Sequence, residues 1–273
     1  MQILQRLQAQ PASDGAGVRI QRLAGFQASS HFDPFLMLDE FDSCEPDDYL
    51  AGFPPHPHRG FETITYMRVG QMDHEDHLGH QGRVQGGGIQ WMRAGRGIIH
   101  SEMPGQQQGR MHGFQLWLNL PAHEKMSAPR YADFASAQLP EFTLDGHQLK
   151  LLAGQYQQWQ APLDSGQSRL RYLDVGFDSD APLKIQATAG DHLLLYVYQG
   201  VVKCDTASLT ARQALVAAVD GEVLLTAQSG SRALVLLGQP LKEPVVHYGP
   251  FVMNSRAEIE QAIRDYNSGQ LAQ

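Results

Sequence analysis

The sequence predicts an all-β fold with two domains and one short helix near the C-terminal end. Short runs rich in β-branched and aromatic residues recur along the chain, and Gly, Pro and Asp separate them. Helical spacing of apolar residues is nearly absent. Many short strands joined by turns are typical of a β-sandwich or β-barrel. Because 273 residues exceed the usual size of one domain, we expect two.

The first half contains three well-marked strands. Residues 61–69 (FETITYMRV) are rich in β-branched and aromatic side chains and end at Gly70. Residues 114–120 (FQLWLNL) lie between Gly113 and Pro121, and residues 89–92 (IQWM) lie between glycine-rich turns. These runs predict the sheets of a first β-domain.

Strand-like runs return after a less regular stretch at about 128–160, where we place the domain junction. The later runs are 192–199 (HLLLYVYQ), 222–228 (EVLLTAQ) and 232–238 (RALVLLG), which are apolar enough for buried strands. The sequence therefore predicts two β-domains, at 1–135 and 136–273.

The one clear helix is predicted close to the C-terminal end of the chain. Ser255 can cap it, and Glu258 occupies the position of the capping-box acid. Apolar residues then recur at helical spacing up to Gly269, at Ile259, Ala262, Ile263 and Tyr266. This apolar face should pack on one of the β-domains.

Composition excludes several classes of protein. No apolar run approaches the roughly 18 to 20 residues of a membrane helix, and the N-terminus does not resemble a secretory signal, so a cytoplasmic location is expected. The net charge of −8 and the lack of a basic cluster argue against direct nucleic-acid binding. Cys44 and Cys204 are far apart in the sequence, which fits two inert thiols in a reducing compartment.

Histidines are concentrated in the first half, and two pairs of residues there have the spacing of metal ligands. His56 and His58 are alternate residues, so on a strand both imidazoles lie on one side, about 7 Å apart. His100 and Glu102 repeat that spacing after the glycine-rich turn at residues 95–97. On facing strands, these four side chains could converge on one metal ion.

Three imidazoles and one carboxylate suit a first-row divalent metal. Six-coordination would leave two positions open, so catalysis at the metal is possible. A closed structural zinc site usually contains cysteine, and none lies near these residues in the sequence. We expect Fe(II), with Mn, Co, Ni, Cu or Zn as alternatives.

Three stretches of the first half closely resemble the pirin family of the cupin superfamily. They are 54–66 (PPHPHRGFETITY), 74–80 (HEDHLGH) and 90–104 (QWMRAGRGIIHSEMP). The resemblance continues through 112–120 (HGFQLWLNL), weakens in the second half, and returns at 243–254 (EPVVHYGPFVMN). It covers nearly the whole chain.

This resemblance implies a bicupin, with two cupin-type β-barrels and a short C-terminal helix. The first barrel would hold iron through the residues that match His56, His58, His100 and Glu102, whereas Glu62, which completes the general cupin pattern, would stay outside the ligand set. The second half has no His-x-His pair, so the C-terminal barrel is expected to bind no metal.

The resemblance also implies two alternative functions. One is quercetin 2,3-dioxygenase activity, in which a flavonol or a related aromatic or enol substrate reacts with dioxygen. Glu102 is then the candidate to accept the hydroxyl proton. The other is a non-enzymatic, iron-dependent regulator that binds a transcription factor or a metabolic enzyme. The acidic composition suits such protein partners better than DNA.

Overall fold

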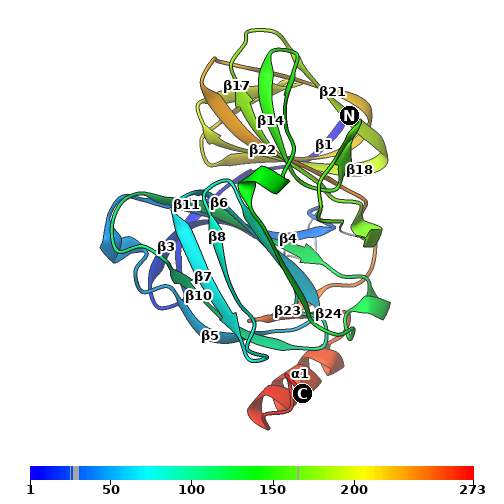
Figure 1. Ribbon diagram of the computed structural model, residues 1–273. Coiled ribbons are helices and arrows are strands. Elements are labelled where there is room, and N and C mark those ends of the chain that lie inside the picture. Colours follow the sequence, from blue (N-terminus) through cyan, green and yellow to red (C-terminus); the bar gives the residue numbers. More distant parts are fainter. Residues whose placement is uncertain (25, 27–30, 165) are drawn as a thin grey trace. The chain divides into compact units, whose positions relative to one another are not determined.

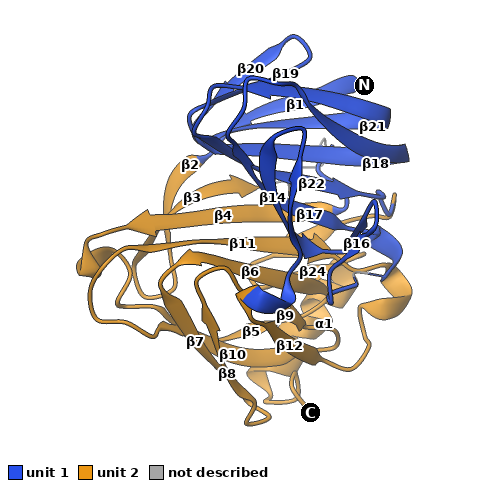
Figure 2. Cartoon of the chain, turned by 45° about the horizontal axis from the view of Figure 1, so that its top comes forward, with its two compact units in different colours: residues 1–9, 29–34, 137–241 blue, residues 10–28, 35–136, 242–273 orange. Residues whose placement is uncertain are grey.

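A computed structural model describes residues 1–24, 26, 31–164 and 166–273. These residues form mostly β-structure, with one α-helix among them, near the C-terminal end (Figure 1). It divides into two compact units, coloured separately in Figure 2. Unit 1 comprises residues 1–9, 29–34 and 137–241, and unit 2 comprises residues 10–28, 35–136 and 242–273. Within the described part of the chain, no helix has the length and apolarity needed to cross a membrane.

Unit 2 contains a seven-stranded sheet in the order β12-β9-β6-β11-β4-β3-β2 and a four-stranded sheet in the order β5-β10-β7-β8. The predicted strand 61–69 is β6. The strand predicted at 89–92 lies within β9, and the one predicted at 114–120 overlaps β11 up to Asn119. The strands of these sheets are β2 (Gln10–Asp14), β3 (Val18–Ala24), β4 (Phe35–Ser43), β5 (Phe53–His58), β6 (Phe61–Val69), β7 (Gln71–Asp76), β8 (Gln81–Gln85), β9 (Ile89–Arg93), β10 (Ile98–Pro104), β11 (Met111–Asn119) and β12 (Arg130–Phe134).

The C-terminal segment of unit 2 forms the hairpin of β23 (Val246–Tyr248) and β24 (Phe251–Met253), followed by α1 (Arg256–Asn267). As predicted, the side chain of Ser255 caps the helix by accepting a hydrogen bond from the Glu258 backbone nitrogen. Ile259 and Ala262 are buried against Phe251 and Met253 of β24, so the apolar face of α1 packs on this hairpin.

Unit 1 is built on a nine-stranded sheet in the order β13-β14-β17-β22-β18-β21-β19-β20, with β1 paired to β21. Its core is a large apolar cluster that includes Leu195, Val235 and Leu215. The strands of this unit are β1 (Gln2–Gln8), β13 (Glu141–Leu144), β14 (His147–Ala153), β15 (Gln155–Tyr156), β16 (Trp159–Gln160), β17 (Arg171–Phe177), β18 (Leu183–Gln199), β19 (Val201–Cys204), β20 (Ala207–Thr210), β21 (Gln213–Ala227) and β22 (Ser231–Gly238). The prediction that this half binds no metal stays a prediction.

The predicted fold class, all-β with two domains and a terminal helix, is confirmed. The structure corrects one detail, because the sheets are open rather than closed barrels. The seven-stranded sheet, for example, runs from β12 at one edge to β2 at the other, and these two edge strands do not pair. The arrangement is that of a cupin jelly roll.

The predicted division at residues 135 and 136 stays a proposal for the two domains. The compact units differ from it at both ends of the chain. Strand β1 pairs with β21 of the second half, and residues 242–273 belong to the unit that contains β5 and β10. Local composition does not reveal either difference, because both depend on contacts between residues far apart in sequence.

The two cysteines differ in their surroundings, and both are free. Cys204 is fully buried, and burial raises the pKa of its thiol to about 12, whereas Cys44 is exposed. Since the thiolate is the reactive form, we expect a thiol reagent to label one cysteine per native chain and two after denaturation. Mass spectrometry of the labelled peptides checks this. Rapid labelling of Cys204 in the native protein would contradict the buried position.

Candidate metal centre

Strands β5 and β10 bring the predicted histidines together because the two strands are antiparallel neighbours in one sheet. His100 lies directly opposite His56, and Ile98 lies opposite His58. Since alternate residues of a strand lie on one face, His56, His58 and His100 all project to the same side of the sheet. The histidines that were predicted on facing strands are therefore carried by two paired strands.

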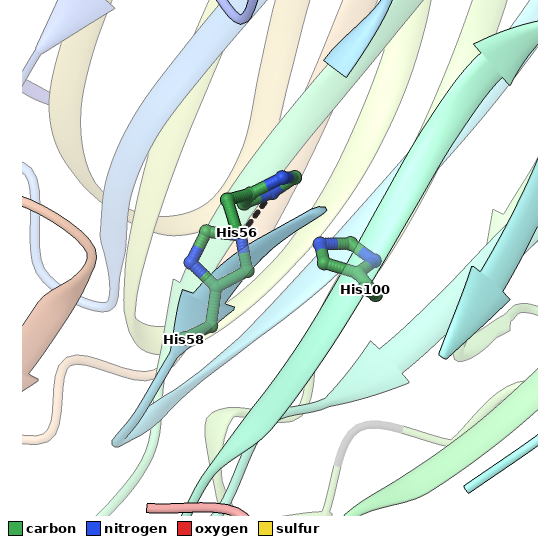
Figure 3. A group of neighbouring side chains, drawn as sticks. All are labelled: His56, His58 and His100. Atoms are coloured by element: carbon green, nitrogen blue, oxygen red, sulfur yellow. Dashed lines mark hydrogen bonds between the residues drawn. The ribbon is translucent and has the colours of Figure 1, made fainter. Parts of the chain in front are cut away.

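The three imidazoles converge, as Figure 3 shows. The Nε2 atoms of His56 and His58 are 3.0 Å apart, and the ring centroid of His100 lies 4.4 Å from that of His56 and 5.0 Å from that of His58. One nitrogen from each ring falls in a group whose members all lie within 4.8 Å of one another. Three nitrogen donors at this spacing can share one metal ion.

The protonation states of the rings leave lone pairs free for a cation. His56 Nδ1 lies 2.8 Å from the Pro54 carbonyl oxygen, which only accepts hydrogen bonds, so Nδ1 carries the proton and Nε2 the lone pair. Burial lowers the pKa of His58 and of His100 well below the ordinary imidazole value, and the neighbouring imidazoles lower it further. Both rings are therefore neutral at pH 7.

His100 gives the clearest sign that a ligand belongs here. Its side chain is 2% exposed, and neither ring nitrogen has a hydrogen-bond partner among the described residues. A buried polar atom without a partner is costly, so such atoms mark a place where an ion, a water molecule or a ligand binds. A divalent metal held by three imidazoles fits these donors.

Glu102 lies on the same strand as His100 but outside the three-imidazole group. Its carboxylate accepts hydrogen bonds from Gln115 Nε2, at 2.9 and 3.1 Å, and from Thr65 Oγ1, at 3.1 Å. The pairing of β5 and β10 is irregular between His100 and Glu102, beside Pro54 and Pro55, so that Glu102 lies opposite Phe53. Glu102 as a fourth ligand stays a prediction.

A pocket of about 780 Å³ reaches His56, His58 and Glu102. Its wall is largely apolar and aromatic, with a few polar groups, a composition typical of small-molecule sites. The pocket is lined by Phe26, Met37, Phe53, Pro54, Pro55, Pro57, Trp117 and Pro250, by the polar side chains of Asp14, Arg22, Gln115 and His247, and by several small residues.

Aromatic rings pack beside the imidazoles, and two of them, Phe26 and Trp117, line the pocket. The rings of Phe61 and Trp117 are stacked at 4.2 Å, and each meets His58 edge to face at 5.0 and 5.2 Å. Phe26 stacks on His247, with ring centroids 3.7 Å apart, and approaches Trp117 at 6.1 Å. These rings exclude water from one side of His58, which accounts for its low pKa.

Glu62 and His112 both pair with charged groups at a distance from the imidazole group. Glu62, which the resemblance leaves outside the ligand set, is buried and accepts a hydrogen bond from Arg93 Nε at 2.7 Å. His112 Nε2 lies 3.1 Å from Glu40 Oε1, in a second cluster of possible ligands with Asp42. Since Arg110 bonds Asp42 through two nitrogens, a cation already neutralises that cluster.

The histidines at 74–80 lie in different surroundings. His74 lies on β7, is 4% exposed, stacks on Tyr131 at 4.2 Å and bonds Asp133 at 3.0 Å. Strand pairing with β10 buries it, with Glu102 directly opposite. His80, by contrast, lies after the strand and bonds Asp76.

Sequence reasoning missed the residues that two distant segments bring to the pocket, namely the C-terminal tail (residues 242–273) and the segment before β4. His247 and Pro250 come from the C-terminal segment, and Arg22 and Phe26 come from the segment before β4. None is close in sequence to the histidine motif. Gln115, in the predicted strand 114–120, was visible only as one of two polar residues in an otherwise apolar run.

The tail also supports the strand that carries His56 and His58. The backbone nitrogen of Val252 donates to the Arg59 carbonyl at 3.0 Å, and Lys125 Nζ donates to the carbonyl oxygens of Gly60 and Val252. Gly60 has a φ of +91°, and a Cβ atom there would lie 2.0 Å from the Val252 oxygen. Glycine is therefore required where the tail crosses the end of β5.

Comparison with known proteins agrees with this architecture. The family model described as Pirin matches residues 17–118, and the model described as Pirin C-terminal cupin domain matches residues 172–272. A provisionally named quercetin 2,3-dioxygenase of Pseudomonas aeruginosa is 47% identical, over 96% of this chain and 95% of its own. A pirin-like protein of Caulobacter vibrioides is 44% identical over 98% of each chain.

A solved structure resembles the whole chain. The crystal structure of quercetin 2,3-dioxygenase from Acinetobacter baumannii superposes with a TM-score of 0.92 at 33% identity, over 99% of this chain and 98% of that one. Together with the matches to both family models, this likeness shows that the chain belongs to the pirin family of cupin proteins.

Proposed function

We propose that this protein is a metal-dependent dioxygenase that cleaves a flavonol such as quercetin, or a related enol, at one iron ion. One observation carries the proposal: three imidazoles converge beside a largely apolar pocket of about 780 Å³. The names of relatives in Pseudomonas aeruginosa and Acinetobacter baumannii support the same reaction class.

The residues proposed to hold the metal are His56, His58, His100 and Glu102. Neutral nitrogen donors and one carboxylate suit Fe(II), and they also suit Mn, Co, Ni, Cu or Zn. When bound, such a metal supplies Lewis-acid stabilisation of an enolate oxygen. The buried ring nitrogens of His100, which lack other partners, support this donor set.

The side chains around the pocket account for the other requirements of the reaction. Phe26 and Trp117 offer flat apolar surface for an aromatic ring system, and together with Met37 they limit the access of water. Arg22 and Asp14, which are paired with each other, add polar groups that can bind the hydroxyls of a polyphenol. Glu102 is proposed to take the proton of the reacting hydroxyl, which leaves the substrate as its enolate.

The pocket also bears on the choice between an enzyme and a regulator. A regulator that presents its metal site to a partner protein needs an accessible surface over the site, whereas an enzyme needs a cavity that encloses a substrate. The pocket is within the usual range of roughly 300 to 1,000 Å³ for small-molecule sites, and it reaches three of the proposed ligands, His56, His58 and Glu102. This favours the enzyme.

The experiment is a quercetin assay on iron-loaded protein, with oxygen uptake measured in parallel. We expect loss of quercetin with matching consumption of dioxygen, and we expect His56→Ala and Glu102→Ala each to abolish both signals. His123→Ala, at a side chain that is 62% exposed, is the matched control and should keep full activity. Activity that survives both ligand substitutions would reject the proposal.

A further inference from the structure

Arg22 and Asp14 form an ion pair in the wall of the pocket beside the metal centre, on the hairpin of β2 and β3. The buried side chain of Asp39 holds one edge of the guanidinium. Its two carboxylate oxygens accept hydrogen bonds from Arg22 Nε, at 2.9 Å, and from Nη2, at 2.6 Å, while Nη2 also donates to Asp14. A bidentate bond of this kind fixes both the position and the plane of the guanidinium.

The pair keeps hydrogen-bonding capacity for a ligand. No hydrogen bond links Nη1 of Arg22 to any residue that the structure describes, and the side chain is partly exposed. The exposed Asp14 carboxylate accepts from the Gly15 backbone nitrogen at 2.7 Å and from Arg22, which leaves a lone pair on each oxygen. A donor and an acceptor therefore lie next to each other in the pocket wall.

The turn that carries Asp14 packs against the residue that precedes β5. Gly15 has a φ of +58°, and a Cβ atom there would lie 2.4 Å from the Gly52 carbonyl oxygen. The same oxygen accepts a hydrogen bond from the Ala16 backbone nitrogen at 3.0 Å. Only glycine permits this close approach. Asp14 is therefore held at a defined place relative to the strand that carries two of the imidazoles.

The charges around the pair favour a neutral ligand over an anion. Burial raises the pKa of Asp39 to about 6, so this carboxylate is mostly ionised at pH 7. Asp14 and Asp39 together place two carboxylates on one guanidinium, which leaves one negative charge. Burial also lowers the pKa of His247, so the nearest imidazole in the pocket wall adds no positive charge at pH 7. A carboxylate or phosphate ligand would be repelled here.

Two adjacent hydroxyls on an aromatic ring, a catechol, match these groups. One hydroxyl can donate to the Asp14 carboxylate while its neighbour accepts from Arg22 Nη1, and both bonds involve an ionised partner. The flat ring can lie against Phe26 and Trp117, which line the same pocket. A ring without hydroxyls makes the apolar contacts alone.

We propose that Asp14 and Arg22 form a specificity subsite that binds the catechol ring of a ligand in the pocket. Flavonoids with this ring should therefore bind in preference to those whose ring carries no hydroxyl. The inference rests on the proposed function, because it takes the pocket to hold a flavonol whose other end reacts at the metal. It deepens that function by naming the substrate class.

A purely structural role for the ion pair makes a different prediction. Both residues belong to one hairpin, and the pair could serve only to stabilise the pairing of β2 with β3. Loss of the Asp14 charge would then loosen the pocket wall and weaken every flavonoid by a similar factor. If the pair binds a catechol, the loss falls on catechol ligands alone.

The test is calorimetric titration of metal-free protein with luteolin and with chrysin. These two flavones share the fused ring system and lack the hydroxyl proposed to react at the metal, and they differ only in the two adjacent hydroxyls that luteolin carries. We expect wild-type protein to bind luteolin about tenfold more tightly than chrysin, the effect of hydrogen bonds to charged groups. In Asp14→Asn, which keeps the acceptor for the Gly15 nitrogen, the preference should fall below about threefold.

Two more variants complete the set. Arg22→Met removes the donor and should also reduce the preference for luteolin, with little change in the affinity for chrysin. Asp73→Asn is the matched control, since Asp73 is likewise paired with an arginine, Arg83, but does not line this pocket. It should keep the wild-type preference.

Equal affinities of wild-type protein for the two flavones would overturn the inference without any variant. It would also be overturned if Asp14→Asn weakened both flavones by the same factor. Because the titration uses neither metal nor dioxygen, its result is independent of the quercetin assay. A protein that prefers luteolin through Asp14 but does not consume quercetin would refute the proposed reaction and leave the catechol subsite in place.

Discussion

Replacing His100 by alanine is expected to reduce metal affinity by more than about 100-fold, since orienting groups alone contribute 10- to 100-fold, and to abolish turnover. Wild-type protein at a metal concentration of 100 times Kd should gain about 2.7 kcal/mol of stability over the metal-free form. His100→Ala should lose that gain. The metal-free variant should be destabilised less than a usual truncation of a buried side chain, because the ring that is lost has no hydrogen bonds.

Thermal unfolding with added metal and with a chelator measures both effects, and elemental analysis of the purified chains gives the metal content. His123→Ala serves as the control because its side chain is largely exposed. A His100→Ala protein that still binds one metal per chain with native affinity would show that His56 and His58 form the site without it. The proposed donor set would then be wrong.

The fold was predictable where local pattern determines structure. The run 61–69 is β6 without any change of bounds, because its side chains suit a pleated, buried strand. The capped helix after Ser255 was equally clear. The second half was less predictable, since runs that looked like short separate strands belong to the long strands β18 and β21.

The long strands escaped prediction because a change of register connects their two parts. In β18 the pairing with β21 shifts between Ala187 and Asp191, and the intervening residues include Gly190 at a φ of +83°. Asp191 turns inward and accepts hydrogen bonds from the Thr188 nitrogen and Gln239 Nε2, each at 2.6 Å. A polar and glycine-containing stretch of this kind normally indicates a turn, so the sequence alone favours two strands.

The candidate site, like the fold, could be predicted only in part from the sequence. The i, i+2 spacing was sufficient to bring His56, His58 and His100 together, because strand geometry makes alternate residues share a face. The place of Glu102 depends on the irregular pairing beside Pro54 and Pro55, and its partner Gln115 comes from β11. Such details depend on pairing between distant strands, which spacing within one motif does not encode.

Arg59 links the end of β5 to the C-terminal helix. Of the substitutions discussed, its replacement should lower the free energy of unfolding most. The guanidinium is 4% exposed, donates from Nε to the Arg96 carbonyl, and bonds Asp265 through Nη1 at 2.7 Å. Arg59→Met leaves both acceptors without this donor. Removing one partner of a buried pair costs about 3 to 5 kcal/mol. Since Asp265 is partly accessible, we expect about 2 to 4 kcal/mol by urea unfolding.

The same ion pair gives a pH dependence with a definite sign. Its hydrogen bond from Arg59 lowers the pKa of Asp265 below the ordinary carboxyl value, so the folded state binds fewer protons there than the unfolded state. The stabilisation is present above about pH 4 and is lost as the pH falls through the lowered pKa. Arg59→Met and Asp265→Asn should therefore both unfold with a weaker dependence on pH in the acid range.

Metal binding provides the link between this ion pair and the site. Arg59 follows His58 directly, and Arg96 precedes the strand that carries His100, so the guanidinium connects the ends of both ligand strands. Arg59→Met should weaken Co(II) binding although no ligand is changed. Arg256→Met removes an ion pair on α1 whose arginine is 90% exposed. This control should change neither the stability nor the cobalt affinity measurably. If the Arg59→Met protein is less stable but keeps native cobalt affinity, Arg59 contributes to the stability of the fold and not to metal binding. The geometry of the imidazoles would then depend only on the pairing within the sheet.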